Sequence, residues 1–528
     1  MKKIVYMSML LLSVYGSKAV AQQTAKGCVY LDANANGKKD GKEKGMPGVA
    51  VSNGREVVTT DNKGRYKLPV SDDAIIFVIK PSGYALPLNA DNQPKHYYIH
   101  KPKGSPKFEY AGSAPTGPLP ASIDFPLRPQ KESNNFKALV FGDPQIYDDR
   151  ELGYFDKGIV SEVVGVKDVA FGISLGDLAG KDLGYHKPYS KTVAKIGIPW
   201  YNVEGNHDMN NDAPVDSLAD ETFEANFGPN TYSYNYGNAH FIILDDNLYP
   251  DPRGHRRGLW AGFTEKQLEF IKNDLELVDT SKLVVLAFHC SMYIVNENSF
   301  RKEDRNRLFN LLQPYPHVLA LSAHSHNQRQ HFYGKEEGWN GAAPFHEFNV
   351  GATCGNWYSG RVNAQGVMES VMSDGTPRGY VYLNVSGNQY TADYKVAGKP
   401  ADYQIGLYHR KVMSTIWWDG QGFIYANFFM GHKGSELECR IDNGGWKRMI
   451  YTEEGDPAFI SELYKWDDSD SLFRGRRPTT YANSLHLWKM RLPENLGVGT
   501  HQVEVRATDP FGRKFVQKSA YRIEEPTF

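Results

Sequence analysis

The sequence is poor in cysteine and in net charge. Only four cysteines occur in 528 residues, and they are widely spread: Cys28, Cys290, Cys354 and Cys439. This excludes the dense disulfide framework of a small cross-linked domain, and we expect mostly unpaired, buried thiols. The 60 basic and 61 acidic residues leave a formal charge of -1. Near-neutrality excludes a chain that is drawn as a whole to nucleic acid or to anionic lipid.

Long apolar segments are also scarce, and the one near the N-terminus has the features of a secretory signal peptide. A lysine pair precedes it, it extends from Ile4 to about Val14, and small residues at 19–21 follow. It is shorter than the roughly 20 apolar residues that a membrane span needs, so no transmembrane segment is expected. We predict a signal peptide over residues 1–21 and an exported protein, in the periplasm, on the cell surface or in the medium.

The remaining chain divides into three parts, because it is too long for one hydrophobic core. Residues 22–132 carry short alternating segments between Gly-containing turns, typical of a β-sandwich domain, and end in a Pro- and Gly-rich linker over 112–129. Residues 133–398 alternate apolar strands with amphipathic helices, which predicts a layered α/β fold. Residues 399–528 return to strand patterns and predict an immunoglobulin-like β domain.

One helix of the middle part is signalled strongly. Thr264 and Gln267 have the spacing of a capping box, in which the side chain of each residue accepts the backbone N–H of the other. Apolar residues at 268, 271, 275 and 278 follow at helical spacing. A helix is therefore predicted to begin directly after Thr264.

Five polar clusters in the middle part directly follow apolar, strand-like runs. They are Asp143-Pro144-Gln145, Gly176-Asp177, Gly205-Asn206-His207-Asp208, His289, and His324-Ser325-His326. Ligands bind at the carboxyl ends of strands in open α/β sheets, so these side chains are expected to converge. Carboxylate, amide oxygen and imidazole suit Mn, Fe or Zn, and a carboxylate can bridge two cations. Cys290 is expected to point to the opposite face of the strand that carries His289.

In this order the motifs resemble the pattern of the calcineurin-like metallophosphoesterases, over roughly residues 136–330. The resemblance implies a four-layered α-β-β-α sandwich, and the flanking β modules look like those of exported bacterial members. It also implies two divalent metal ions with Asp177 as the bridge. The first would be held by Asp143, Gln145, Asp177 and His326, and the second by Asp177, Asn206, His289 and His324.

The activity that the resemblance implies is hydrolysis of a small phosphate ester. Two cations about 3.5 to 4 Å apart would generate a bridging hydroxide for attack on phosphorus and would clamp the phosphoryl oxygens. His207 would donate a proton to the leaving oxygen. Two alternatives stay open: a phosphodiesterase or pyrophosphatase with the same mechanism, and a non-catalytic surface-binding protein with a degenerate site. The substrate, the native metals and the oligomeric state are left open.

Two positions depart from the family pattern. Gln145 stands where most members have His, which predicts weaker metal binding or a different ion there. Gly180 stands where the family often has an Asp that orients the catalytic His. Asp182 and Asp208 are the candidates to replace it, and Asp208 is therefore grouped with His207 as a candidate catalytic residue.

Three further features have a structural and a functional interpretation each. A possible calcium loop near the N-terminus has oxygen ligands at alternate positions, whereas several lysines and strand-like flanks count against it, and the alternative is a polar turn; its residues are Asp32, Asn34, Asn36, Asp40 and Glu43. The loop around Trp357 and Tyr358 is expected to complete the second sheet, or else one ring stacks on an organic leaving group. Asn247 either approaches the site or ends a strand.

Overall fold

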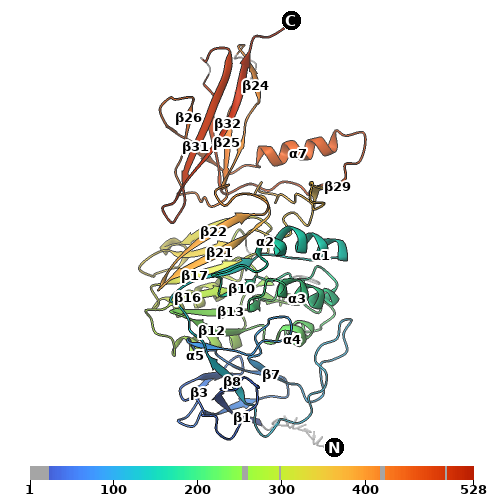
Figure 1. The fold of residues 1–528 in the computed structure, drawn as a ribbon, viewed down its shortest axis with the longest axis vertical. Helices are drawn as coiled ribbons and strands as arrows, with labels where there is room; N and C mark the ends of the chain where they lie inside the picture. Colours follow the sequence, from blue (N-terminus) through green and yellow to red (C-terminus); the bar gives the residue numbers. More distant parts are fainter. Residues whose placement is uncertain (1–22, 253–259, 297–298, 417–421, 494–495) are drawn as a thin grey trace, which may run out of the picture.

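The computed structural model describes residues 23–252, 260–296, 299–416, 422–493 and 496–528. The predicted signal peptide over residues 1–21 lies outside the described residues. Three parts follow one another along the long axis of the molecule, in the order of the sequence: a small β module, a central α/β body and a C-terminal β domain (Figure 1). Among the described residues, no helix is both long enough and apolar enough to cross a bilayer.

The N-terminal module is a sandwich of two four-stranded sheets. One sheet has the order β4 (Arg65–Val70), β1 (Gln23–Leu31), β8 (Phe125–Pro129) and β6 (Tyr84–Ala85). The other has the order β3 (Val57–Thr59), β2 (Ala50–Ser52), β5 (Ala74–Val78) and β7 (Tyr97–His100). Side chains alternate between the core and the solvent along β4, as expected for a sheet with one solvated face.

The predicted linker over 112–129 is wrong at its end. Its last residues form β8, which pairs in parallel with β1 through Val29 and Phe125. Phe125 and Leu127 are buried, so the strand contributes two alternate side chains to the core of the sandwich. The prolines of β8 disguised this alternation in the sequence, because proline is usually a sign of a strand edge or a loop.

The central body contains two sheets that pack face to face. The five-stranded sheet has the order β11 (Trp200–Asn202), β10 (Phe171–Ser174), β9 (Asn135–Phe141), β21 (Gly379–Ser386) and β22 (Gln389–Val396). The six-stranded sheet has the order β12 (Tyr232–Tyr236), β13 (Ala239–Ile243), β16 (Leu283–Ala287), β17 (Val318–Ser322), β19 (Phe345–Asn349) and β18 (Arg329–Tyr333).

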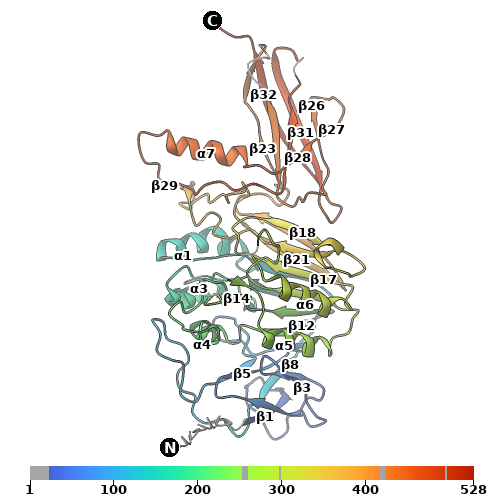
Figure 2. The same cartoon turned by 180° about the vertical axis from the view of Figure 1, so that it is seen from behind.

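Helices cover the outer faces of these sheets, which confirms the predicted α-β-β-α arrangement (Figures 1 and 2). On one side lie α1 (Asp149–Phe155), α2 (Ser161–Val163), α3 (His186–Ala194) and α4 (Glu221–Phe227). On the other lie α5 (Glu265–Leu275) and α6 (Lys302–Leu312). The predicted capping box is also confirmed: the Thr264 hydroxyl accepts the N–H of Gln267, and the Gln267 side chain accepts the N–H of Thr264.

Parallel pairing determines where the polar loops meet. β9, β10 and β11 run parallel to one another, and so do β13, β16, β17 and β19. Parallel strands bring their carboxyl ends to the same edge of a sheet. The loops that follow these strands therefore gather at one end of the central body.

The C-terminal domain is a second sandwich, as predicted, but it carries a helix that was not. One sheet has the order β23 (Ile405–Tyr408), β25 (Phe423–Phe428), β30 (Leu487–Arg491) and β28 (Ile450–Thr452). The other has the order β24 (Val412–Ser414), β32 (Lys514–Glu524), β31 (Gly499–Thr508), β26 (Leu437–Ile441) and β27 (Lys447–Arg448). Helix α7 (Pro457–Asp467) is capped by the Asp456 carboxylate, which accepts the N–H of Phe459.

A buried lysine joins the N-terminal module to the central body. The Lys101 side chain is only 4% exposed, and its ammonium lies 2.7 Å from Glu221, 3.1 Å from Glu224 and 2.9 Å from Asp73. These carboxylates hold the pKa of Lys101 above its usual value although burial lowers it. A buried charge that loses its partner is strongly destabilising.

Lys101→Met is therefore expected to lower the free energy of unfolding by about 3 to 5 kcal/mol, because it leaves buried carboxylates without a counter-charge. Urea denaturation followed by tryptophan fluorescence measures this change. Arg55→Met is the matched control, since it removes an ion pair with Glu269 at the same junction whose Arg side chain is 53% exposed. Equal stability of the two variants would contradict the prediction.

Candidate metal centre

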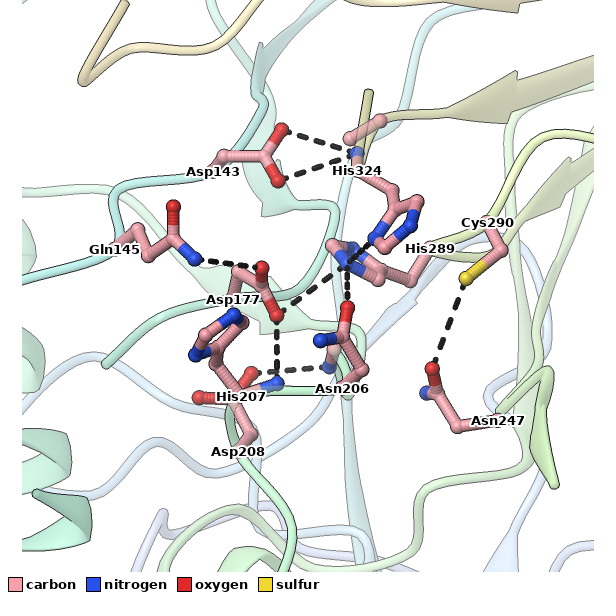
Figure 3. A network of polar contacts seen from close by, with 12 residues as sticks. Asp143, Gln145, Asp177, Asn206, His207, Asp208, Asn247, His289, Cys290 and His324 are labelled. Carbon is pink, nitrogen blue, oxygen red and sulfur yellow. Dashed lines mark hydrogen bonds and ion pairs between the residues drawn. The ribbon is translucent and has the colours of Figure 1, made fainter. Parts of the chain in front are cut away.

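The seven predicted ligands lie together where the loops of the two sheets meet, and Figure 3 shows all of them except His326 with labels. The loops after β9, β10 and β11 contribute Asp143, Gln145, Asp177 and Asn206, and the loops after β16 and β17 contribute His289, His324 and His326. A contact from backbone to side chain joins the two sheets here: the backbone nitrogen of His324 lies 3.2 Å from both carboxylate oxygens of Asp143. Their role as ligands stays a prediction, but their convergence is a property of the fold.

His289 lies at the centre of the cluster. Its Nδ1 lies 2.8 Å from the carbonyl oxygen of Leu175, and a carbonyl can only accept, so Nδ1 is the atom that carries the proton. Nε2 then faces two oxygen acceptors, Asn206 Oδ1 at 3.1 Å and Asp177 Oδ1 at 3.3 Å, and it also lies 3.1 Å from His324 Nδ1. Acceptors that face one another at these distances require a proton or a cation between them.

His326 and Gln145 repeat this arrangement on the other side of Asp177. His326 Nδ1 donates to the carbonyl oxygen of Gly355 at 2.7 Å, which leaves Nε2 to face Asp143 Oδ1 at 3.7 Å. The Gln145 amide donates to Asp177 Oδ2 at 3.1 Å, while its buried oxygen has no hydrogen-bond partner among the described residues. A buried oxygen without a donor is costly, and a cation would satisfy it.

The electrostatics of the cluster also call for positive charge. Burial and the neighbouring Asp177 raise the pKa of Asp143 to about 8, although His289 opposes the shift. Burial lowers the pKa of His289, but the adjacent Asp177 carboxylate more than offsets it and raises the value to about 10. The ligand atoms of Asp143, Asp177 and His289 lie within 4.8 Å of one another. Two carboxylates, two amides and three imidazoles therefore fit divalent cations such as Mn, Fe or Zn.

The backbone at the site is strained. Five of the seven candidate ligands have a positive φ: Asp143 at 38°, Gln145 at 39°, Asp177 at 50°, His324 at 67° and His326 at 48°. Non-glycine residues rarely adopt this conformation, and where they do so they tend to cluster at functional sites. Glycine at position 205 lets the backbone pass close to Asp177, since a Cβ there would lie 2.4 Å from Asp177 Oδ1.

His207 is oriented by a backbone carbonyl. Its Nδ1 lies 2.6 Å from the carbonyl oxygen of Gly180, and its backbone N–H donates to Asp177 Oδ1 at 2.8 Å. A side chain at position 180 has no room, because a Cβ there would lie 2.5 Å from the Tyr147 ring. Tyr147 and the Gly180 carbonyl thus occupy the place expected for an orienting carboxylate. The prediction that Asp182 or Asp208 orients His207 is therefore wrong.

Asp208 has a structural role instead of the catalytic one that was predicted. Its buried carboxylate accepts the N–H groups of Leu178, Ala179 and Gly205 at 3.0 to 3.1 Å and contacts His186 Nε2 at 3.0 Å. With these contacts it ties the loop after β10 to the loop after β11. Asp182 accepts the N–H of Gly184 and caps the short helix over Leu183–Tyr185.

The orientation predicted for Cys290 is wrong. Its Sγ belongs to a group with His289 and His324 whose ligand atoms lie within 4.8 Å of one another. Strand β16 ends at Ala287, so the alternation of side chains on which the prediction rested does not extend to Cys290. All four cysteines are free and buried, as predicted.

Asn247 begins the short strand β14 (Asn247–Leu248) beside Cys290 (Figure 3). Its amide donates to the Glu204 carbonyl at 3.2 Å and to the Asp245 carboxylate at 2.9 Å. Its side-chain oxygen lies 3.8 Å from Cys290 Sγ. Asn247 thus approaches the site and begins a strand, and its amide braces the surrounding loops.

The possible calcium loop forms a polar turn that is closed by its own side chains. Asp32 accepts the N–H groups of Asn36 and Gly37 at 3.1 Å, and Arg128 Nε lies 3.3 Å from the same carboxylate. Arg128 therefore supplies positive charge to this buried acid. Calcium binding by Asp32, Asn34, Asn36, Asp40 and Glu43 stays a prediction.

The loop after β19 supports the candidate metal centre directly. The Trp357 ring stacks on His326 with 4.2 Å between centroids and 21° between planes. Tyr358 is buried, and its hydroxyl donates to the Pro144 carbonyl at 2.7 Å, which braces the first ligand loop. Tyr147 was missed by the sequence analysis, and its place two residues after Gln145 was the only available signal.

Two family models match the chain. Residues 33–112 match the N terminal of calcineurin-like phosphoesterase, and residues 347–515 match the C terminal of calcineurin-like phosphoesterase. No curated protein matches the chain.

Several solved structures are similar to the chain. They include the GAP50 anchor in the inner membrane complex of Plasmodium (14% identity, 50% of this chain and 85% of that chain, TM-score 0.32). A purple acid phosphatase from yellow lupin (Lupinus luteus) seeds matches with 15% identity over 71% of this chain and 66% of that chain, with a TM-score of 0.35. Vps29 of Chaetomium thermophilum matches with 10% identity over 73% and 98%, with a TM-score of 0.22. Both flanking family models, together with the ordered motifs gathered at one site, support the calcineurin-like phosphoesterase superfamily for this chain.

Proposed function

We propose that this protein is an exported phosphoesterase that hydrolyses a small phosphate ester at a dinuclear metal centre. The observation that carries the proposal is the cluster around Asp177 and His289, in which Nε2 of His289 faces Asn206 Oδ1, His324 Nδ1 and Asp177 Oδ1 at 3.1 to 3.3 Å, an arrangement that a shared cation would satisfy. Two divalent cations bound there would lower the pKa of a water molecule and offset the charge of the phosphoryl oxygens.

The ligands divide into two sets that share Asp177. His326 lies toward Asp143 and Gln145 contacts Oδ2 of Asp177, whereas Asn206 and His324 lie toward His289. Second partners of the imidazoles orient them: the Leu175 carbonyl holds His289, and the Gly355 carbonyl holds His326. Such outer contacts fix the tautomer and the ring orientation of a metal ligand.

His207 is the proposed general acid. Since Nδ1 donates to the Gly180 carbonyl, Nε2 is the ring atom left to hold a proton for the leaving oxygen. The backbone N–H of His207 donates to Asp177, the proposed bridging ligand, and this hydrogen bond holds the general acid at a fixed position relative to the metal centre.

Export is proposed from the sequence alone. The lysine pair, the short apolar segment and the small residues at 19–21 support a signal peptide. The mature protein would then act in the periplasm, on the cell surface or in the medium.

Hydrolysis of an aryl phosphate monoester and of the matching diester by residues 22–528, with Mn²⁺ added, tests the proposed function. We expect turnover of at least one of the two substrates, and its loss on treatment with a chelator. Two bound metals without turnover of either substrate would count against a general phosphoesterase. Fewer than one ion per chain after reconstitution would support a non-catalytic binding protein.

Gln145→Ala is expected to lower the metal content from about two ions per chain to about one, because it removes the unpartnered buried oxygen from one set of ligands. Gln145→His is the matched control: histidine tolerates positive φ better than most residues and supplies a nitrogen ligand. Elemental analysis after gel filtration measures both. A full complement of metal in Gln145→Ala would remove Gln145 from the set.

A further inference from the structure

A segment of the C-terminal domain reaches the candidate metal centre. The short strand β29 (Gly475–Arg476) pairs with β20 (Gly360–Arg361), directly after the loop that carries Trp357. Both views show β29 beside α1, on the side of the C-terminal domain that faces the central body (Figures 1 and 2). The buried Asn356 fastens this contact, since it accepts the N–H of Thr479 at 2.9 Å and donates to the Thr479 hydroxyl at 2.8 Å.

This contact lies within one residue of the support for a candidate ligand. The carbonyl of Gly355, next to Asn356, accepts the Nδ1 proton of His326. The ring of Trp357, on the other side of Asn356, stacks on the same imidazole. The C-terminal domain therefore holds the loop that orients His326.

Arg476 contacts the loop that carries Trp357 and, through Glu151, the residue Tyr147. Its Nη1 donates to the Trp357 carbonyl at 3.2 Å and lies 3.8 Å from Glu151 Oε1. Glu151 in turn accepts the backbone N–H of Tyr147 at 3.0 Å, and the Tyr147 ring lies beside His207 with 6.2 Å between centroids. Through these contacts, Arg476 is connected to the side of the centre where the proposed general acid lies.

The Arg476 guanidinium has donors to spare. The side chain is 57% exposed, and its ion pair with Glu151 is long. A guanidinium has five N–H donors in a planar fork that suits phosphate and carboxylate oxygens. Neighbouring Arg477 differs, because it forms a two-point ion pair with Asp467 at 2.5 and 2.8 Å.

We propose that Arg476 binds an anionic group on the leaving-group side of the substrate, so that phosphate esters with a second phosphate or a carboxylate are preferred. The inference rests on the proposed function. The charge of the phosphoryl group that is transferred would be met by the two cations. The leaving group departs toward His207, and Arg476 is linked to that side through Glu151, whose carboxylate also accepts the Tyr147 N–H. The C-terminal domain thereby contributes to substrate choice.

Three related substrates test the proposal: phenyl phosphate, 3-carboxyphenyl phosphate and 1,3-phenylene bisphosphate. We expect the wild-type protein to have a higher kcat/KM for the two compounds that carry a second anionic group than for phenyl phosphate. For each substrate with a second anionic group, the ratio of its kcat/KM to that of phenyl phosphate should fall about 10- to 100-fold in Arg476→Ala, the range of one charge-assisted hydrogen bond. The kcat/KM for phenyl phosphate itself should change by less than about threefold. Arg476→Lys should retain part of the preference. The two anionic compounds show whether phosphate or carboxylate is favoured.

Arg477→Ala is the matched control and should leave the ratio unchanged, because its side chain is committed to Asp467. An equal loss on all three substrates in Arg476→Ala would assign Arg476 to support of the Trp357 loop and overturn the proposal, as would an unchanged ratio. Binding of benzylphosphonate and 3-carboxybenzylphosphonate to the metal-loaded protein, measured by calorimetry, separates this inference from the proposed function. If no substrate is hydrolysed, the proposed function fails, and the ratio of the two Kd values still decides the role of Arg476.

Discussion

Asp177→Asn is expected to abolish binding of both metal ions together and to lower kcat/KM for phosphate esters by about 1,000-fold or more, equivalent to ~4 kcal/mol. The reason is its position between the two sets of candidate ligands. One oxygen faces His289 and accepts the His207 N–H, while the other accepts the Gln145 amide. An amide keeps the shape of the carboxylate but loses its charge and one of its two acceptor oxygens. Elemental analysis and steady-state kinetics measure the two effects.

Asp208→Asn is the comparison for this variant. Its carboxylate accepts backbone N–H groups instead of facing the acceptor cluster, so the variant should lower the thermal unfolding midpoint and yet keep two metals in the folded fraction. If Asp177→Asn bound both metals as tightly as the wild type, Asp177 would not be the bridge.

His207→Gln is expected to lower kcat for an alkyl phosphate by about 100- to 10,000-fold, the usual range for loss of a general acid. An activated aryl phosphate should lose less than about tenfold, because its leaving group departs without a proton. Metal content should stay at two ions, since His207 contributes its backbone N–H, and no side-chain atom, to Asp177. Rates for a series of esters that differ in the pKa of the leaving group measure the effect as a steeper dependence on that pKa.

The control for His207 is Asp182→Ala, which removes a carboxylate two residues after Gly180 in the sequence. Asp182 caps a short helix, so this variant should keep the wild-type dependence on the leaving group. An equal loss on alkyl and aryl esters in His207→Gln would show that His207 positions the substrate and does not donate the proton.

The Gly180 position shows how far residue patterns carry the argument. The spacing of Gly180 from Asp177 revealed that a family carboxylate was absent, and nearby acids were the natural replacements. The orienting group is instead the carbonyl of Gly180 itself, 2.6 Å from His207 Nδ1. A backbone carbonyl is present at every residue, so no sequence pattern distinguishes the one that faces an imidazole. Only the folded loop, with the Tyr147 ring against Gly180, identifies it.

The same limit applies to Cys290 and to Arg476. Alternation along a strand predicts which face a side chain takes, but it holds only while the strand continues, and β16 ends before Cys290. Arg476 lies 119 residues from Trp357 in sequence, and their contact exists because a loop of the C-terminal domain pairs with β20. Contacts between distant segments depend on how whole domains dock.

By itself the sequence determined the α/β body between two β modules, the capping box at Thr264, and the order of the seven candidate ligands after the ends of strands. These features follow from local hydrophobic period, from helix-end chemistry and from the rule that parallel strands end at one edge. Tertiary structure alone decided the left-handed backbone of five ligands, the carbonyls that orient the imidazoles, and the approach of the C-terminal domain to the centre. These depend on packing between segments that are far apart in the chain, and the residue types of one segment do not encode it.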